Sequence, residues 1–165
     1  MRYAYYANLK PRDKATYRRS DEVVKLTLRN RAALAPLVAE IDRALASEQR
    51  SRIEQASQAL ANAIAATFEV PRVRVKVLSR RPSTRDSELH GLYDPADGRT
   101  QPVIRVWMRT SHHKRVVAFR TFLRTLLHEL CHHLDYELLK LEDSFHTEGF
   151  FKRESSLFKQ LVPAH

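Results

Sequence analysis

The segment His128-Glu129-Leu130-Cys131-His132 constrains the fold of this chain more than any other part of its sequence. Its two histidines are four residues apart, and residues with that separation lie on the same face of an α-helix. Both imidazoles can therefore bind one metal ion, with Glu129 beside them to accept a proton from a bound water molecule. This arrangement requires a continuous helix with one face turned to the metal and another turned to the core.

The residues around this segment have the period of a core-facing helix. Apolar side chains recur at steps of three and four residues, at Phe119, Phe122, Leu123, Leu126, Leu130 and Leu134. A second stripe is formed by Thr121, Thr125, His128, His132 and Asp135. Ser111 is placed to cap the helix at its start. We therefore predict one long helix that begins near residue 111 and carries two metal ligands.

A catalytic zinc site normally has three protein ligands and one open position, so a third residue must come from outside the helix. Leu138 stands where a more compact motif would place its third histidine. His146 is the next histidine, and the polar run 140–144 supplies a turn that returns the chain toward the helix. We favour His146 because a neutral imidazole suits zinc, with Glu148 and Glu154 as the alternatives.

Thr125 to Phe151 resembles the SprT-like and WLM-type zinc metallopeptidases, which belong to the larger zincin group. In those families H-E-L-x-H is followed, after a variable loop, by H-x-x-x-F, and the counterparts here are His128, Glu129, Leu130, His132, His146 and Phe150. The resemblance covers the C-terminal quarter of the chain well and the rest in outline. It implies one zinc ion per chain, held by three histidines, with Glu129 as general base. Many SprT-like proteins also carry a cysteine-rich zinc ribbon, whereas this chain has one cysteine.

The chemistry expected of such a site is the hydrolysis of a peptide bond. Zinc lowers the pKa of a bound water toward neutrality, and Glu129 takes its proton and later gives it to the leaving amine. Tyr136 and Tyr93 are candidate donors to the oxyanion that forms. Asp135 is a candidate hydrogen-bond partner for a metal-binding imidazole. Each of these three side chains also has an ordinary alternative, as a packed aromatic ring or a solvated helix residue.

Two helices are predicted before the metal-binding helix. Asn30 is placed to cap the first, although Pro36 in its early turns moves the expected start nearer to Ala35. Ser47 is placed to cap the second, whose apolar face ends near Phe68. We assign no chemistry to either helix.

Three strands are predicted after these helices. Alternating valines indicate a strand over residues 73–77, and further strands are expected over residues 88–93 and 102–108. The predicted fold is therefore α+β and zincin-like, with N-terminal helices, a small mixed sheet of about three strands, the long metal-binding helix and a C-terminal helix. By that resemblance, the segment 91–93 or the strand that contains Ile104 forms the wall of a cleft where an extended substrate adds to the sheet edge.

The positive charge is concentrated in two regions. Residues 1–20 are a tyrosine-rich arm with six basic residues against one acidic residue, and residues 72–124 hold thirteen against four, within a net charge of +10. Both regions are candidates to bind nucleic acid, although the arm can equally pack on its own domain. We expect residues 21–165 to form a single metallopeptidase domain.

Composition excludes several classes of protein. One cysteine rules out an intrachain disulfide framework, no apolar run reaches the roughly eighteen residues of a membrane span, and the first residues lack a secretory signal. We therefore expect a cytoplasmic zinc metalloendopeptidase with no membrane contact, which acts on a protein or peptide substrate, including nucleic-acid-associated proteins. The alternative is a non-catalytic nucleic-acid-binding or protein-interaction module with a structural zinc site. The sequence leaves the oligomeric state open.

Overall fold

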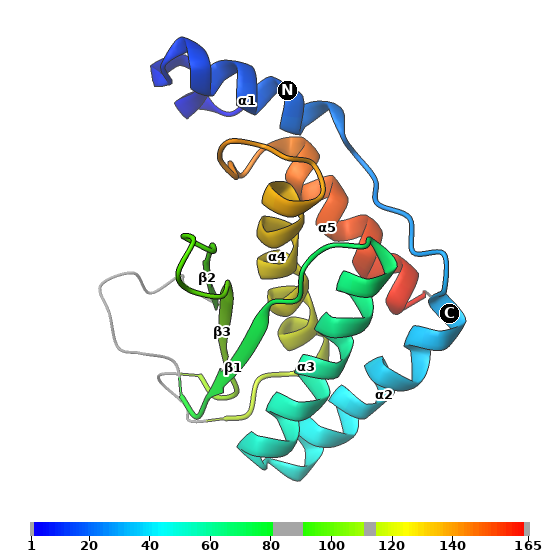
Figure 1. The fold of residues 1–165 in the computed structure, drawn as a ribbon. Coiled ribbons are helices and arrows are strands. Elements are labelled where there is room, and N and C mark those ends of the chain that lie inside the picture. Colours follow the sequence, from blue (N-terminus) through cyan, green and yellow to red (C-terminus); the bar gives the residue numbers. More distant parts are fainter. Residues whose placement is uncertain (1, 81–90, 111–114, 164–165) are drawn as a thin grey trace.

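The computed structural model describes residues 2–80, 91–110 and 115–163 (Figure 1). Within them the chain forms a short 3-10 helix η1, five α-helices and three strands. In order these are η1 (Ala4–Asn8), α1 (Pro11–Glu22), α2 (Arg31–Ser47), α3 (Arg50–Thr67), β1 (Arg74–Leu78), β2 (Gly91–Asp94), β3 (Val103–Trp107), α4 (Phe119–Glu137) and α5 (Glu148–Leu161). The predicted α+β class is confirmed.

The three strands form the small mixed sheet that was predicted. Their order is β1-β3-β2, with β1 parallel to β3 and β2 antiparallel to it. Val75 and Val77 of β1 are buried, as their alternation with Arg74 and Lys76 indicated. Residues 88–90, expected at the start of β2, lie outside the described residues. Because β3 is central, β2 lies at one edge of the described sheet, where it packs against α4.

Helix α4 lies between the sheet and α5 (Figure 1). Its apolar stripe is buried as predicted, with Leu126 and Leu130 no more than 1% exposed. α2 and α3 pack against each other, and α3 also packs on β1. Within the described residues, no helix combines the length and the apolar character that crossing a membrane requires.

The prediction that the metal-binding helix begins near residue 111 is wrong, because α4 begins at Phe119. Just before it, the described residues 115–118 form no helix and are extended. Arg109 forms an isolated antiparallel bridge with Val116, and the N–H of Val117 donates to the carbonyl of Met108 at 2.7 Å. The two β-branched valines suit this extended conformation. Ser111, the predicted cap, lies outside the described residues.

The prediction that the first of the two early helices starts near Ala35 is also wrong. α2 begins at Arg31, directly after Asn30, whose carbonyl accepts the N–H of Leu34 at 3.2 Å. Leu34 is already buried, so its packing requires the first turn to be helical. Pro36 lacks a backbone donor but stays inside the helix, where this packing offsets the lost hydrogen bond.

The predicted cap of α3 is wrong as well, since Ser47 is the last residue of α2. Its hydroxyl donates to the carbonyl of Ala44 at 2.6 Å. Glu48 then adopts a left-handed conformation with φ of 57°, which ends α2 sharply. Gln49 is left as the N-cap residue of α3.

The basic arm packs on the domain, which is one of the two outcomes left open for it. Most of it is helical in η1 and α1, and α1 continues through the boundary expected at residue 20. Tyr17 is fully buried, and the hydroxyls of Ser20 and Thr147 lie 3.1 Å apart. A β-carbon on Gly149 would stand 2.7 Å from the carbonyl oxygen of Ser20, so only glycine allows α1 to approach α5 this closely.

Candidate metal centre

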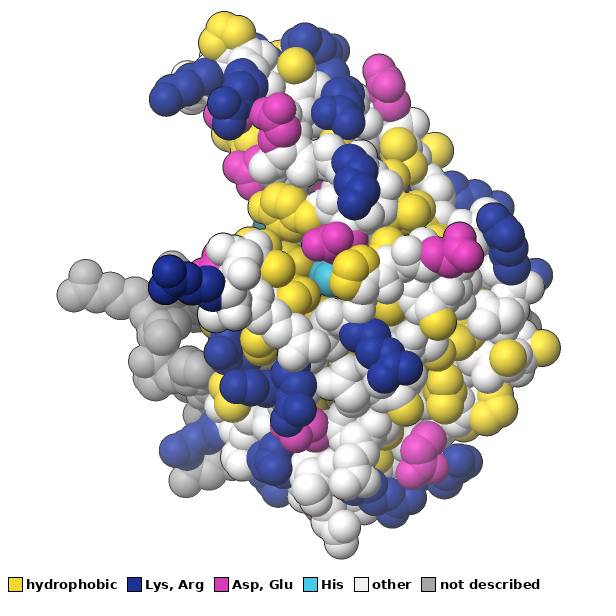
Figure 2. Space-filling view, viewed as in Figure 1, with side chains coloured by type: hydrophobic (Ala, Val, Ile, Leu, Met, Phe, Trp, Pro, Cys, Tyr) yellow, Lys and Arg dark blue, Asp and Glu magenta, His cyan; other side chains and the backbone are white. Residues whose placement is uncertain are grey.

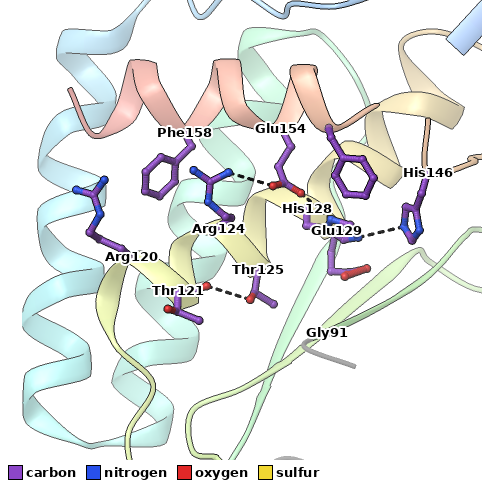
Figure 3. Close-up of a pocket in the computed structure, with 11 residues that line it drawn as sticks. Gly91, Arg120, Thr121, Arg124, Thr125, His128, Glu129, His146, Glu154 and Phe158 are labelled. Atoms are coloured by element: carbon purple, nitrogen blue, oxygen red, sulfur yellow. Dashed lines mark hydrogen bonds and ion pairs between the residues drawn. The ribbon is translucent and has the colours of Figure 1, made fainter. Parts of the chain in front are cut away.

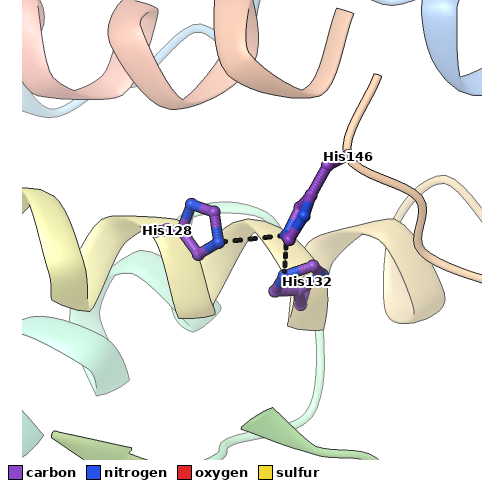
Figure 4. A group of neighbouring side chains, drawn as sticks. All are labelled: His128, His132 and His146. Atoms are coloured by element: carbon purple, nitrogen blue, oxygen red, sulfur yellow. Dashed lines mark hydrogen bonds between the residues drawn. The ribbon is translucent and has the colours of Figure 1, made fainter. Parts of the chain in front are cut away.

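The three predicted histidines come together. His128 and His132 project from α4, and His146 reaches them from the connection between α4 and α5 (Figure 4). One ring nitrogen of each lies within 4.8 Å of the other two, and the Nε2 of His146 is 3.2 Å from that of His128 and 3.0 Å from that of His132. A tetrahedral zinc ion with bonds of about 2.0–2.1 Å separates its nitrogen ligands by roughly 3.3 Å. Both distances from His146 therefore lie within a few tenths of an ångström of the separation that zinc requires.

His128 is held by a carboxylate. Its Nδ1 lies 2.6 Å from Oε1 of Glu154, which can only accept a hydrogen bond when ionised. The Nδ1–H therefore donates to Glu154, which leaves the Nε2 lone pair directed at the metal position. Burial acts to lower the pKa of His128, but this hydrogen bond and the charge of Glu129 outweigh it and raise the pKa.

His132 is held through an intermediate hydroxyl. The hydroxyl of Ser144 donates to Oδ2 of Asp135 at 2.7 Å, so its lone pair accepts the Nδ1–H of His132 at 2.6 Å. The Nε2 of His132 is again left free for a metal. Asp135 is therefore not the direct hydrogen-bond partner of an imidazole, and it reaches His132 only through Ser144. Burial, together with the charges of His128 and His146, lowers the pKa of His132 to about 3, which keeps it neutral as a ligand requires.

Arg153 extends this chain of contacts into the core. It is fully buried, and its Nη2 donates to Oδ1 of Asp135 at 3.0 Å and to the hydroxyl of Ser20 at 2.9 Å. Its Nη1 donates to the carbonyl of Val23 at 2.6 Å. The imidazole of His132 is therefore linked to α1 through one continuous hydrogen-bonded path.

His146 is positioned by aromatic residues. Its carbonyl accepts the hydroxyl of Tyr5 at 2.8 Å, which ties the arm to the third ligand. The ring of Phe150 lies 4.7 to 5.2 Å from the rings of His128, His132 and His146, measured between centroids. This ring packs behind the three imidazoles and limits their rotation.

Glu129 lies in the same cleft and is 5% exposed. Burial raises its pKa to about 7, against the opposing charge of His128. β2 passes close to it, since a β-carbon on Gly91 would stand 3.1 Å from the side chains of Glu129 and Thr125. The carboxyl is therefore enclosed between α4 and the edge strand, with a pKa close to neutrality.

The two tyrosines predicted as oxyanion donors stand beside the cluster, and their hydroxyls have partners. His133 Nε2–H donates to the carbonyl of Pro71 at 2.7 Å, so its Nδ1 accepts the hydroxyl of Tyr93 at 2.8 Å. The hydroxyl of Tyr136 donates to Asp143 at 3.0 Å. Both rings line a cavity next to His132, but in this arrangement their hydroxyl hydrogens point elsewhere.

Two cavities meet at the cluster. The larger, about 730 Å³, follows α4 and α5 toward Arg120 (Figure 3). The smaller, about 310 Å³, lies toward Tyr93. Both are lined by Gly91, His128, Glu129 and His146. Figure 2 shows a histidine on the floor of this hollow, with hydrophobic and acidic side chains around it. Of the two predicted cleft walls, 91–93 lines the cavities, whereas Ile104 is fully buried.

The structure does not bring either alternative third ligand into the cluster. Glu148 begins α5 and pairs with Lys152 at 3.2 Å. Glu154 binds Nδ1 of His128, on the far side of that ring from the metal position.

Three contributors to the site were not predicted. Ser144 belongs to a polar run interpreted only as a turn, and Tyr5 to an arm whose docking site the sequence does not specify. The buried contact of Arg153 could have been predicted, because an arginine within the buried face of α5 requires a buried partner.

Replacing Ser144 by alanine tests the support of His132. We expect zinc affinity to fall by roughly 10- to 100-fold, because the Nδ1–H of His132 loses its acceptor. Competition with a chromophoric chelator measures the change. Ser51→Ala, at an exposed position on α3, should leave the affinity unchanged. Equal affinities for wild type and Ser144→Ala would mean that this hydrogen bond does not hold the ligand.

No protein-family model, curated protein or solved structure matches this chain.

Proposed function

We propose that this protein is a zinc-dependent metalloendopeptidase of a zincin-like, SprT- or WLM-related kind. The observation that carries the proposal is the convergence of three histidine Nε2 atoms beside a buried glutamate in one cleft. His128, His132 and His146 would hold one zinc ion per chain, which supplies Lewis acidity and lowers the pKa of a water molecule. The hydrogen bonds to Glu154 and Ser144 support this assignment, because each fixes the tautomer that a metal ligand needs.

Glu129 is the general base in this proposal. It accepts a proton from the attacking water and returns it to the amine of the leaving peptide. A pKa of about 7 supports the role, since a base works best when its pKa lies near the pH of operation. Its place beside Gly91 puts the carboxylate where a peptide laid along β2 would meet it.

An extended peptide is the substrate that suits the cleft. β2 is one of the two edge strands of the described sheet and the one next to the histidine cluster, and a peptide can add to such an edge through main-chain hydrogen bonds. Cavities on both sides of the histidine cluster leave room for chain on both sides of the cleaved bond, which favours an endopeptidase. A cytoplasmic location is part of the proposal and is supported by the single cysteine, Cys131, which is free and buried.

A non-catalytic module with a structural zinc is the second candidate, and the net charge of +10 favours nucleic acid as its partner. A buried glutamate next to the ligands argues against it, because structural zinc needs no base and burial of a carboxyl is costly. A protease that acts on nucleic-acid-associated proteins combines the two ideas.

Metal content and hydrolysis test the proposal together. We expect close to one zinc per purified chain by elemental mass spectrometry, with cleavage of unfolded protein substrates that stops on chelation and returns on zinc addition. A chain that takes up no zinc overturns the proposal. One zinc per chain without hydrolysis of any substrate overturns the catalytic role and favours the structural module.

A further inference from the structure

The larger cavity ends in two arginines. It runs from the histidines along the first turns of α4 to Arg124 and Arg120, with α5 opposite (Figure 3). The two arginines are four residues apart, so their side chains leave the same face of the helix. The cavity is therefore neutral or acidic at one end, beside Glu129, and cationic at the other.

Both guanidinium groups are held in place by one aromatic ring. The Cζ atom of Arg124 lies 4.2 Å from the ring centroid of Phe158, and that of Arg120 lies 5.1 Å from it. A guanidinium stacked on a ring keeps its N–H groups available at the edge, where a carboxylate can bind with two hydrogen bonds. Because the ring restricts both side chains beforehand, less entropy is lost when an anion binds.

The cationic charge at this end is only partly compensated. Arg124 Nη1 lies 3.2 Å from Oε2 of Glu154, but the other oxygen of that carboxylate is bound to His128. No carboxylate pairs with Arg120 among the residues that the structure describes. Of the two arginines only Arg124 contacts a described carboxylate, and that carboxylate also binds His128, so this end of the cavity can accept a further negative charge.

The spacing places these arginines within a few residues of the cleaved bond. Along the helix axis, Arg124 and Arg120 lie about 6 Å and 12 Å before His128. An extended peptide advances roughly 3.3–3.6 Å per residue, so these distances correspond to about two and three to four residues.

We propose that this cavity is a specificity subsite for a substrate carboxylate, bound by Arg120 and Arg124 within about four residues of the cleaved bond. The proposal rests on the proposed peptidase function. The carboxylate has two possible sources, an aspartate or glutamate side chain or the C-terminus of a peptide. The net charge of +10 is consistent with an acidic substrate, which such a field attracts.

Peptides that differ in one group distinguish these sources. In C-terminally amidated peptides, a single glutamate is placed in turn at each of four positions on either side of the cleavage site. Each glutamate peptide has a counterpart with glutamine at the same position. One further glutamine peptide has a free C-terminus. We expect glutamate at one position to raise kcat/KM about tenfold or more over glutamine, mainly through KM, as hydrogen bonds to charged groups allow. A preference only for the free C-terminus would identify the terminal carboxylate as the ligand.

Substitutions test the two arginines. Arg120→Gln should lower kcat/KM for glutamate peptides toward the value for glutamine peptides, and Arg120→Glu should shift the preference toward lysine. Arg124→Gln should act in the same direction, with zinc content measured because Arg124 contacts Glu154. Arg74→Gln, an exposed position on β1 at the opposite edge of the sheet, should keep the preference.

The carboxylate subsite and the peptidase activity can be tested separately. Hydrolysis of glutamate and glutamine peptides at equal rates overturns the carboxylate subsite and leaves the peptidase standing. If no peptide is cleaved, fluorescence anisotropy with zinc-loaded Glu129→Gln protein decides the question. The subsite is supported if this protein binds the carboxylate peptide more tightly than its glutamine counterpart and loses that difference when Arg120→Gln is added. Equal binding of the two peptides overturns it.

Discussion

Replacing Glu129 by glutamine is expected to lower kcat for peptide hydrolysis by about 10² to 10⁴-fold, the range that a positioned general base contributes. Glutamine has almost the same shape but cannot accept the proton of the attacking water at neutral pH. Zinc should stay bound, since the ligating atoms belong to His128, His132 and His146. Steady-state kinetics and elemental analysis of the same preparation measure both quantities.

Glu137→Gln provides a matched control, because it makes the same chemical change at the last residue of the same helix, outside both cavities. Its kinetics should equal those of the wild type. Loss of zinc from Glu129→Gln would instead make Glu129 a ligand or a structural residue. Undiminished hydrolysis would mean that another group is the base, or that the activity comes from a contaminant.

The metal helix and the sheet were predictable because their signals are local. Apolar residues at steps of three and four predicted the buried face of α4. The alternation of Val73, Val75 and Val77 with basic residues predicted β1. The start of α4 was not predictable in this way. Val116 and Val117 pair with Arg109 and Met108 just after β3, and that pairing is a tertiary contact that no helix-start pattern reports.

Helix α1 escaped prediction for a different reason. Its buried residues are Thr16, Tyr17 and Ser20, so it has no apolar period for a sequence pattern to detect. Its packing depends on hydrogen bonds to Thr147 and Arg153, which are more than 120 residues away in the chain.

The histidines of the site were predictable, but the groups that orient them were not. A spacing of four residues indicated two candidate ligands, and His146 was favoured as the third because a neutral imidazole after a turn suits zinc. The partners of the Nδ1 atoms come from the connection after α4 and from α5, at Ser144 and Glu154. Whether Glu154 reaches the metal position or the far side of an imidazole depends on how α5 packs on α4, and no spacing rule contains that information.

Replacing Arg153 by methionine is expected to destabilise the protein by about 3–5 kcal/mol, the usual cost of removing one partner from a buried ion pair. Arg153 is fully buried and Asp135 is 1% exposed at its side chain, so neither charge is screened by water. Urea denaturation of the zinc-free protein measures the change. The melting temperature should fall by roughly 6 to 20 °C for a chain of this length. Lys152→Met, the adjacent exposed position on α5, should change stability by no more than about 0.5 kcal/mol.

The pH dependence identifies the cause of this loss. Burial already raises the pKa of Asp135, while Arg153 and Ser144 oppose the rise, so removal of Arg153 should raise it further. An acid whose pKa is higher in the folded state loses stability as the pH rises from its unfolded value, near 3.9, through its folded value. The deficit of Arg153→Met should therefore be largest at neutral pH and shrink as the pH falls toward 4. A loss that is independent of pH would show that Arg153 acts through packing and its contacts with α1, and not through the charge of Asp135.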